Sequence, residues 1–408
     1  MRRRLLECAC VAAVLIAVTV VFKFVPTGTA QSDQTQTLTT AWDAPNLQGI
    51  WTSDYQTPLE RPAQFEDKEF FTDEERTAID SERARLLGQY RETGRRSPRG
   101  SEQDVGGAYD ATIFLTHKHV GRRTSLIVDP PNGRRPPFTP EAQQRRTETR
   151  EYNLALLQST DACKSNRPGC PPYGPPSPRR AESPPHYLTR SANRANGPED
   201  RSLSERCMAG GLPDFGSITG FFLQIIQSPG TVSIFYDTGQ GQGWQRTIPI
   251  TDHPHLPPSV RQWQGDSRGH WDNDTLVVDV TNFSPKTDFH GSREHLHLVE
   301  RWTRLDAETI GYSATMDDPT TWTSPWTVEL ELNLQSNVAN RIYHEPRCHE
   351  GNYGLPGLLA GARAEDRAFA EGRGPDPATL CIAGPTGACG GFAFGFAESG
   401  TETDPLRR

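Results

Sequence analysis

The sequence predicts a mainly β protein, in which an antiparallel sheet is curled into a barrel or sandwich, with a few peripheral helices and long Pro-rich loops. The first observation is that apolar runs of strand length recur between turn signals, and several alternate with a period of two. The second is that short polar connectors at residues 271–274 and 305–308 join consecutive runs, as hairpins require. No long helical segment separates the runs, which excludes a parallel α/β sheet. The runs cover residues 221–226, 232–236, 275–280, 296–302, 309–315, 326–332 and 341–344.

Composition indicates one sizeable core in a chain that also has polar segments. The chain has 408 residues, and its 36 glycines and 34 prolines exceed the usual share. Its 8 tryptophans and 17 phenylalanines are enough for a real core, so we expect the Pro-rich segments to stay outside it. The net charge of −8 comes from 43 basic and 51 acidic residues, which argues against a nucleic-acid binder.

Residues 1–30 carry the marks of a secretory signal peptide. A basic head precedes an apolar run over residues 8–22, and small residues follow at 28–30. The run of about 15 residues is shorter than the ~20 that cross a bilayer, so a cleaved signal is favoured over an anchor held by Lys23. We therefore expect a periplasmic or secreted protein that meets the membrane only if this segment stays uncleaved.

Residues 31–129 are expected to add strands and a surface helix to the core. A G-x-W triplet ending at Trp51 opens a strand and is similar to the start of many lipocalin-type barrels. Residues 72–93 are typical of a helix, because Thr72 and Glu75 can form a capping box at its N-terminus.

Residues 130–200 form a Pro- and Arg-rich insert or linker, since 14 of the 34 prolines lie there. A short helix is expected over residues 140–158, with Thr139 as its N-cap and Pro140 in its first position. The rest is expected to be extended, solvated chain, an interpretation favoured over a basic surface for an acidic partner. The chain then continues as the main β core at 201–372, with a closing helix at 355–371, and a Gly-rich loose tail at 373–408.

Six cysteines follow residues 1–30, and an even number in an exported chain favours disulfides. Six cysteines allow fifteen pairings. Two pairs that are close in sequence lie in Gly- and Pro-rich loops, which leaves one long-range pair. The absence of a C-x-x-C spacing disfavours a zinc site built from thiolates. The expected pairs are Cys163–Cys170, Cys381–Cys389 and Cys207–Cys348.

Six short motifs lie in and around the predicted core. They are RSLSERC at 201–207, HLPP at 255–258, RQWQGDSRG at 261–269, DTLVVDVTNF at 274–283, HLVERW at 297–302 and CHEGNY at 348–353. With these motifs the chain resembles an uncharacterised family of exported bacterial proteins, over about residues 45–130 and 200–370. The resemblance implies export, but it carries over no activity and no catalytic residue.

Glu300 is the first candidate catalytic group. Alternation places it on one strand face with Leu298 and Trp302, and a carboxylate among core residues must be paired or functional. If its role is structural, we expect it to pair with an arginine such as Arg261.

His297 and His349 complete the expected acid–base site, because an imidazole titrates near neutral pH. His297 lies on the strand face opposite Glu300, so a bulge near Val299 is expected to bring both to one concavity. His349 follows Cys348, whose disulfide would hold it in place. The alternative is that His297 is only hydrogen-bonded within the sheet.

Four further residues, two of them arginines able to hold a carboxylate, are expected to bind substrate. No cofactor is predicted. His295 and His297 share one strand face and are a weak alternative site for zinc or another transition metal, since a third ligand at a diagnostic spacing is missing. The substrate-binding residues are Arg261, Trp263, Arg301 and Glu350.

These groups favour an acid–base enzyme, such as a lyase, isomerase, hydratase or hydrolase, that acts on a small apolar molecule in a barrel cavity. The core runs carry more Arg, Asp, His and Glu than a plain barrel needs. The alternative is a non-catalytic periplasmic protein that binds or carries a small molecule between Trp and Phe side chains. The sequence has no G-x-S-x-G, H-E-x-x-H or Walker motif, and no G-x-G-x-x-G before a helix.

The signal peptide gives a first testable prediction. Protein isolated from its native host should begin near Gln31, because the small residues before it suit a signal-peptide cleavage site. N-terminal sequencing measures this directly. Recovery of the chain from the cytoplasm with Met1 intact would contradict export.

Overall fold

The structure is a computed structural model. All the residues that it describes belong to one compact unit, residues 38–408. Within residues 86–93 only the backbone is described. The described residues are 38–53, 55–93, 119–165, 170–188, 193–203, 205–208, 211–215, 222–237, 243–335, 348 and 353–381.

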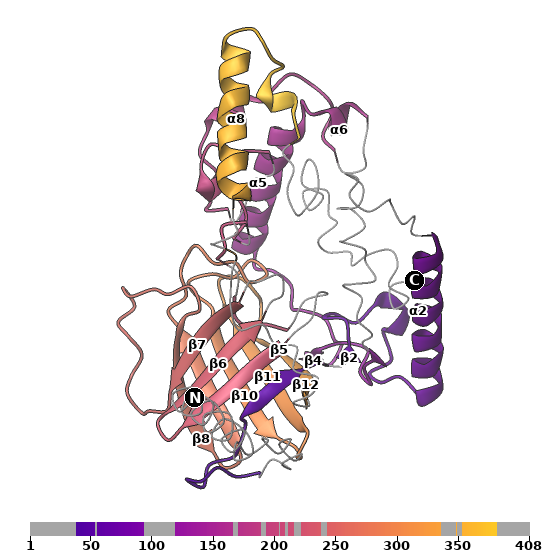
Figure 1. The fold of residues 1–408 in the computed structure, drawn as a ribbon, viewed down its shortest axis with the longest axis vertical. Helices are drawn as coiled ribbons and strands as arrows, with labels where there is room; N and C mark the ends of the chain where they lie inside the picture. The colour runs from indigo at the N-terminus through magenta and orange to yellow at the C-terminus, as the bar shows by residue number, and fades with distance from the viewer. Residues whose placement is uncertain are drawn as a thin grey trace, which may run out of the picture. The chain divides into compact units, whose positions relative to one another are not determined.

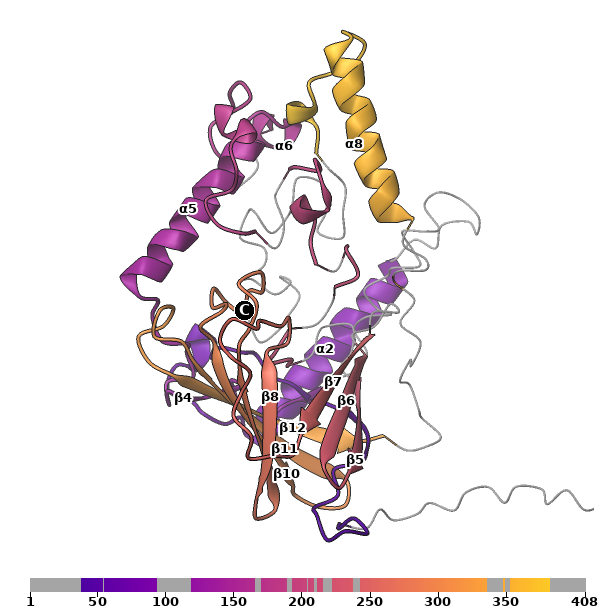
Figure 2. The same ribbon diagram turned by 90° about the vertical axis from the view of Figure 1, so that its left-hand side faces the viewer.

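The core is an antiparallel sheet that closes almost completely into a barrel, as the sequence predicted (Figure 1). Nine of its described strands follow one another in the order β7-β6-β5-β1-β12-β11-β10-β9-β8, and β4 (Ile127–Asp129) pairs with β12 beside this path. The sheet curls until its two end strands approach each other (Figure 2). The backbone amide of Thr251, just after β7, donates to the carbonyl of Gly269 on β8 at 3.0 Å. The strands are β1 (Gly49–Thr52), β5 (Phe222–Ser228), β6 (Thr231–Asp237), β7 (Gly243–Pro249), β8 (Asp266–Asp272), β9 (Thr275–Thr281), β10 (His297–Arg304), β11 (Thr309–Asp317) and β12 (Trp326–Leu334).

Alternation along the strands places one face of each in the barrel core. On β11, Ile310, Tyr312, Ala314 and Met316 are buried and the residues between them are partly exposed. The same period of two appears on β10, as the sequence predicted. The hydrophobic side chains of these faces form one continuous cluster. Burial of this apolar surface is the main source of the barrel's stability.

Two strands, β7 and β8, were not among the predicted apolar runs. The inward position between Trp244 and Ile248 on β7 is Arg246, so its apolar pattern is broken by a charge. On β8 the only large apolar side chain is Trp271. Sequence patterns find strands by their apolar side chains, so strands with polar inward positions are missed.

The two predicted polar connectors are hairpin turns. β8 and β9 are joined by two residues, and Asn273 has a positive φ of 52°, as the turns that suit twisted hairpins require. Residues 305–308 join β10 to β11, and the amide of Leu305 donates to the carbonyl of Thr309 at 3.0 Å. Gly265 precedes β8 with a φ of 68°, and a Cβ there would lie 2.7 Å from the carbonyl oxygen of Thr281. This position therefore requires glycine.

The three predicted helices are present. The helix α2 (Asp73–Thr93) begins with the expected capping box, in which the amide of Thr72 donates to Glu75 at 2.8 Å. The helix α5 (Pro140–Leu157) is capped by Thr139, whose hydroxyl accepts from the amide of Ala142 at 3.2 Å. The helix α8 (Gly354–Ala370) stops before Gly372, which has a φ of 70°.

In the described part of residues 130–200, the chain that follows α5 packs against this helix. Solvated, extended chain was expected there, and that expectation is wrong for these residues. Tyr152 and Leu156 of α5 are fully buried with Leu188. The guanidinium of Arg180 donates to the carbonyl of Leu156 at 3.2 Å. A few apolar residues spread through a Pro-rich segment are enough for this small cluster. The remaining short elements are β2 (Tyr55–Gln56), η1 (Ala63–Phe65), β3 (His119–Val120), α6 (Asp161–Lys164), η2 (Pro178–Ala181), η3 (Pro198–Asp200) and η4 (Pro377–Thr379).

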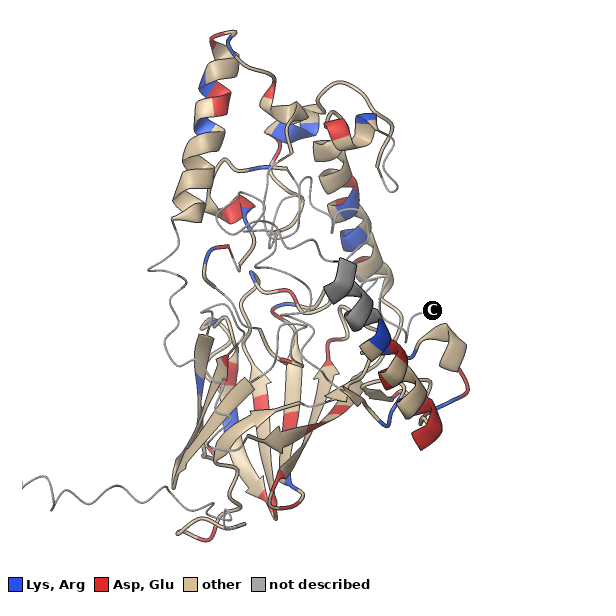
Figure 3. Ribbon diagram, turned by 45° about the vertical axis from the view of Figure 1, so that its right-hand side comes forward, with Lys and Arg blue, Asp and Glu red and all other residues tan. Residues whose placement is uncertain are grey.

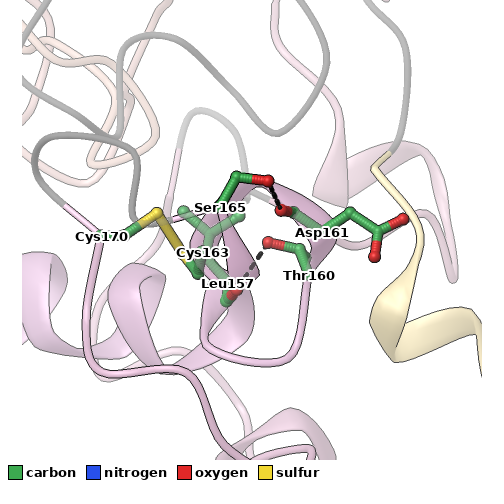
Figure 4. Close-up of a disulfide and its surroundings, with 6 residues drawn as sticks. All are labelled: Leu157, Thr160, Asp161, Cys163, Ser165 and Cys170. Atoms are coloured by element: carbon green, nitrogen blue, oxygen red, sulfur yellow. Dashed lines mark hydrogen bonds between the residues drawn. A yellow bond between two sulfur atoms is a disulfide. The ribbon is translucent and has the colours of Figure 1, made fainter.

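Two of the three expected disulfides lie within the described residues. Cys207 and Cys348 are bridged with their Cα atoms 5.5 Å apart, across 141 residues of sequence. Cys163 and Cys170 close a local loop with a Cα separation of 5.2 Å (Figure 4). Cys381 is also disulfide-bonded, but its expected partner at position 389 lies outside the described residues.

The disulfides indicate an oxidising, non-cytoplasmic environment. Among the described helices, none combines the length and the apolar character that crossing a bilayer demands.

The two bridges should differ in what they contribute to stability. In the loop-entropy model, replacing Cys207 and Cys348 by serine costs about 5 kcal/mol of unfolding free energy, because the closed loop is long. The matched control, serine at Cys163 and Cys170, removes a bridge over 7 residues and costs about 2 kcal/mol. Urea unfolding of both double variants measures the difference. Equal losses, or free thiols at Cys207 and Cys348 in the native protein, would contradict the assignment.

Candidate functional site

Strand β10 carries the candidate residues on two separate faces. Glu300 points into the barrel, whereas His297 lies on the outer face. The expected bulge near Val299 is absent, because β10 pairs in unbroken register with β9 and with β11 on either side of this residue. The expectation that His297 and Glu300 share one concavity is therefore wrong. Charged residues of both signs lie on the barrel strands (Figure 3). Two groups of them contain the candidate residues, an inner cluster around Glu300 and an outer cluster around Asp279.

The inner cluster is centred on the carboxylate of Glu300, which is fully buried. Its Oε2 forms an ion pair with Nη2 of Arg246 on β7, whose side chain is 3% exposed. Its Oε1 accepts a hydrogen bond from the hydroxyl of Tyr312 at 2.9 Å. The arginine that pairs with Glu300 is thus not Arg261, which donates instead to the carbonyl of Glu294 at 2.8 Å.

Glu300 affects the protonation of Arg246 and of Tyr312. Burial works against the Arg246 cation, but the carboxylate of Glu300 outweighs it and raises the pKa of Arg246. Burial, with the Glu300 charge added, raises the pKa of Tyr312 well above its usual range, so this hydroxyl stays protonated and donates. Beside Glu300, the inner cluster therefore holds a charged guanidinium and a neutral tyrosine donor.

Aromatic rings lie on both sides of the ion pair. Tyr236 and Trp244 are stacked, with ring centroids 4.1 Å apart and planes 5° from parallel. Trp302 and Tyr312 pack with their ring centroids 4.3 Å apart. The four rings come from β6, β7, β10 and β11, and Trp244 and Trp302 lie two residues from Arg246 and Glu300 on the same inward faces.

Several buried donors of this cluster have no hydrogen-bond partner among the described residues. Nη2 of Arg246 is used by Glu300, whereas Nε and Nη1 of the same guanidinium make no hydrogen bond. The hydroxyl oxygen of Tyr236 faces the guanidinium of Arg246. Its O–H, like the indole N–H groups of Trp244 and Trp302, has no acceptor among the described residues. Buried polar groups are normally satisfied, so five unpartnered donor atoms in one region need an explanation.

The outer cluster is centred on Asp279 of β9, which joins two histidines. Its Oδ2 lies 2.8 Å from Nε2 of His297, and its Oδ1 lies 2.7 Å from Nε2 of His255. The other nitrogen of His255, Nδ1, lies 2.9 Å from Oδ2 of the buried Asp266. The guanidinium of Arg268 donates to Asp266 at 2.7 Å. A continuous chain of five side chains therefore ends at His297.

The protonation states follow from this chain. A hydrogen bond from His297 is the main cause of the lowered pKa of Asp279. The same bond raises the pKa of His297, against the effect of partial burial and with a further contribution from Asp317. His255 faces a carboxylate oxygen with each of its ring nitrogens, so neither nitrogen is free for another partner.

The other predicted site residues are dispersed. Arg301 lies on the outer face and donates to Asp272 at 2.9 Å, in a pair exposed to solvent. His295 is exposed, and Trp263 is partly buried before β8. Within the described part of the chain, no three His, Cys, Asp or Glu side chains are placed to hold a metal ion. The predicted residues His349 and Glu350 lie outside the described residues.

Sequence reasoning missed the partners of both candidate residues. Arg246 lies 54 residues before Glu300, in a strand that was not predicted. Asp279 and His255 lie within quoted motifs, but nothing local links them to His297. The alternation of β9 does place Asp279 on the outer face, and this signal was available.

A comparison of the chain with models of protein families and with curated proteins finds no match in either.

The inner ion pair gives a stability prediction. Replacing Glu300 by leucine leaves Arg246 buried without its counter-charge and should cost about 3–5 kcal/mol of unfolding free energy. The double variant R246M/E300L removes both charges, so it should recover much of this loss. Urea unfolding at one pH measures the single and double variants. A double variant as unstable as E300L would show that the two charges are not coupled.

Proposed function

We propose that this protein is periplasmic or secreted and binds a small molecule inside its β-barrel. The observation that supports this most is the set of unpartnered donors around Arg246. Leaving a buried donor unsatisfied costs roughly 1–3 kcal/mol for each group. A bound molecule that accepts hydrogen bonds would remove this cost, and barrels of this size are known to hold one small ligand.

The donors define the chemistry of the ligand. Every unpartnered atom of the inner cluster is an N–H or O–H group, so the ligand has to supply acceptor oxygens or nitrogens. Two guanidinium nitrogens of Arg246 add positive charge, but Glu300 balances it. The ligand is therefore neutral or carries a single negative charge.

The shape of the ligand follows from the surrounding rings. Tyr236 and Trp244 on one side, and Trp302 and Tyr312 on the other, present flat apolar surfaces. Aromatic rings pack well against such surfaces, and an acceptor at one end can reach the guanidinium. A small aromatic molecule with a carboxylate, carbonyl or nitro group meets both conditions.

An acid–base enzyme remains the second candidate function. The observation that favours it is the hydrogen bond between Asp279 and His297, because a carboxylate that orients an imidazole is the usual arrangement of a general base. This group lies on the outer face of β10 rather than in the barrel.

Two buried tyrosines allow a matched test with benzoate as the probe. Y236F removes a hydroxyl whose O–H has no acceptor, so it should lower the unfolding free energy less than Y312F does, while weakening benzoate binding about tenfold or more. Y312F removes a hydroxyl that donates to Glu300, so it should lower the unfolding free energy by about 1.5–3 kcal/mol. Quenching of tryptophan fluorescence measures binding, and urea unfolding measures stability.

Benzylammonium is the matched control ligand, because it has the same ring but carries only donors. It should not compete with benzoate for the barrel. Equal binding of the two ligands, or no saturable effect of benzoate, would contradict the proposal and would leave ordered water as the partner of the inner donors.

A further inference from the structure

The outer cluster leaves one ring nitrogen free to act on a substrate. Nε2 of His297 bonds Asp279, whereas Nδ1 makes no hydrogen bond with any described residue. The side chain of His297 is 45% exposed, so Nδ1 can be reached from solvent. His255, the other histidine of the outer cluster, has both ring nitrogens engaged by carboxylates.

Asp279 selects the tautomer that this chemistry needs. In the neutral imidazole one nitrogen carries the proton and the other a lone pair, and the neighbouring acceptor decides which. Because the carboxylate of Asp279 lies 2.8 Å from Nε2, the proton stays on Nε2 and the lone pair is on Nδ1. When Nδ1 takes up a proton, the charge of Asp279 stabilises the imidazolium.

The other side chains of the outer cluster hold Asp279 in position. The second carboxylate oxygen of Asp279 lies 2.7 Å from Nε2 of His255, and His255 is itself fixed by Asp266. Asp266 is buried and bonded to Arg268 and to the amide of Leu256 at 2.9 Å. Asp279 and Asp266 are thus positioning residues: His255 fixes Asp279, and Arg268 and the amide of Leu256 fix Asp266.

We propose that His297 is a general base on the outer face of the barrel, whose Nδ1 removes a proton from a carbon or oxygen acid in a small neutral molecule. The groups that face His297 indicate this charge. They are Asp279 on β9, Asp317 on β11 and His255 on the segment after β7. On β10 itself, Arg301 is occupied by Asp272. Two carboxylates beside the imidazole disfavour an anionic substrate.

The ring opening of 5-nitrobenzisoxazole is a suitable probe reaction, because it needs only a base. Nδ1 takes the proton from C3 of the neutral ring, and the C–H electrons form the third bond of a nitrile. The N–O bond breaks and its electron pair stays on oxygen, which gives 2-cyano-4-nitrophenolate. The imidazolium then releases its proton to solvent. No oxidant or cofactor enters the balance.

The experiment compares the full-length mature protein with three variants across pH 5–9. H297Q should lose the protein-catalysed rate by about tenfold or more, because the base is removed. H295Q is the matched control: His295 is exposed and lies in the turn just before β10, so its loss should leave the rate unchanged.

The variant D279N tests the positioning role through the pH profile. The rate of the wild type should rise with pH as His297 loses its proton, with a midpoint above the ordinary histidine pKa of about 6.5. D279N removes the main cause of this raised pKa, so the midpoint should move to lower pH and the plateau rate should fall. If a group other than His297 were the base, the midpoint of the rate would be the same in D279N and in the wild type.

Three results would overturn the proposal: no loss of rate in H297Q, an equal loss in H295Q, or an unmoved midpoint in D279N. If H297Q does not fold, NMR titration of the imidazoles in the wild type replaces it, and a proton on Nδ1 of the neutral His297 ring would overturn the proposal. Benzoate should bind H297Q as tightly as it binds the wild type, so failure of this base and failure of the barrel ligand site are distinguishable.

Discussion

The ion pair between Arg246 and Glu300 is the constraint on which the rest of the barrel depends. It crosses the interior from β7, at one end of the strand order, to β10, the third strand from the other end. The two end strands meet through a single bridge between Ile250 and Gly269. The ion pair therefore ties together the two sides of the seam where hydrogen bonding between strands is sparse. Because an unpaired charge in the core is costly, only the register that brings both groups together is tolerated.

Alternation along β10 places Glu300 on the inner face of the sheet and His297 on its outer face, so the two residues belong to different chemical environments. The inner face has fixed charges, rings and donors, and it is shielded from water. The outer face has an imidazole whose pKa is raised by its hydrogen bond to Asp279. A regular strand cannot direct neighbouring residues to one face, so His297 and Glu300 cannot act on the same small molecule. The inner cluster suits binding, and the outer cluster suits proton transfer.

The sequence indicates the parts of this structure that are encoded locally. The alternation of β10, β11 and β12, the cap at Thr72 and the anomaly of Glu300 each depend on a few neighbouring residues. The partner of Glu300 depends on how strands far apart in sequence meet around the barrel, and its own strand was hidden because Arg246 occupies a core position. The same reason hid the link from His297 to His255, which lies on a connection that returns along the outer face. Local sequence patterns therefore predict which face of a strand a residue lies on. Its partner on a distant strand can be identified only once the closed barrel topology is known.

The place of β1 in the sheet sets the order in which the barrel can form. This strand is inserted between β5 and β12, and Trp51 pairs with Leu223 on one side and with Leu334 on the other. During synthesis β1 leaves the ribosome first, yet both of its neighbours follow long after it. Pairings between distant parts of a chain pay the entropy of loop closure before they add stability, so they form slowly. The barrel is thus completed only after its last strand is made, and until then the first strand depends on being kept from aggregation.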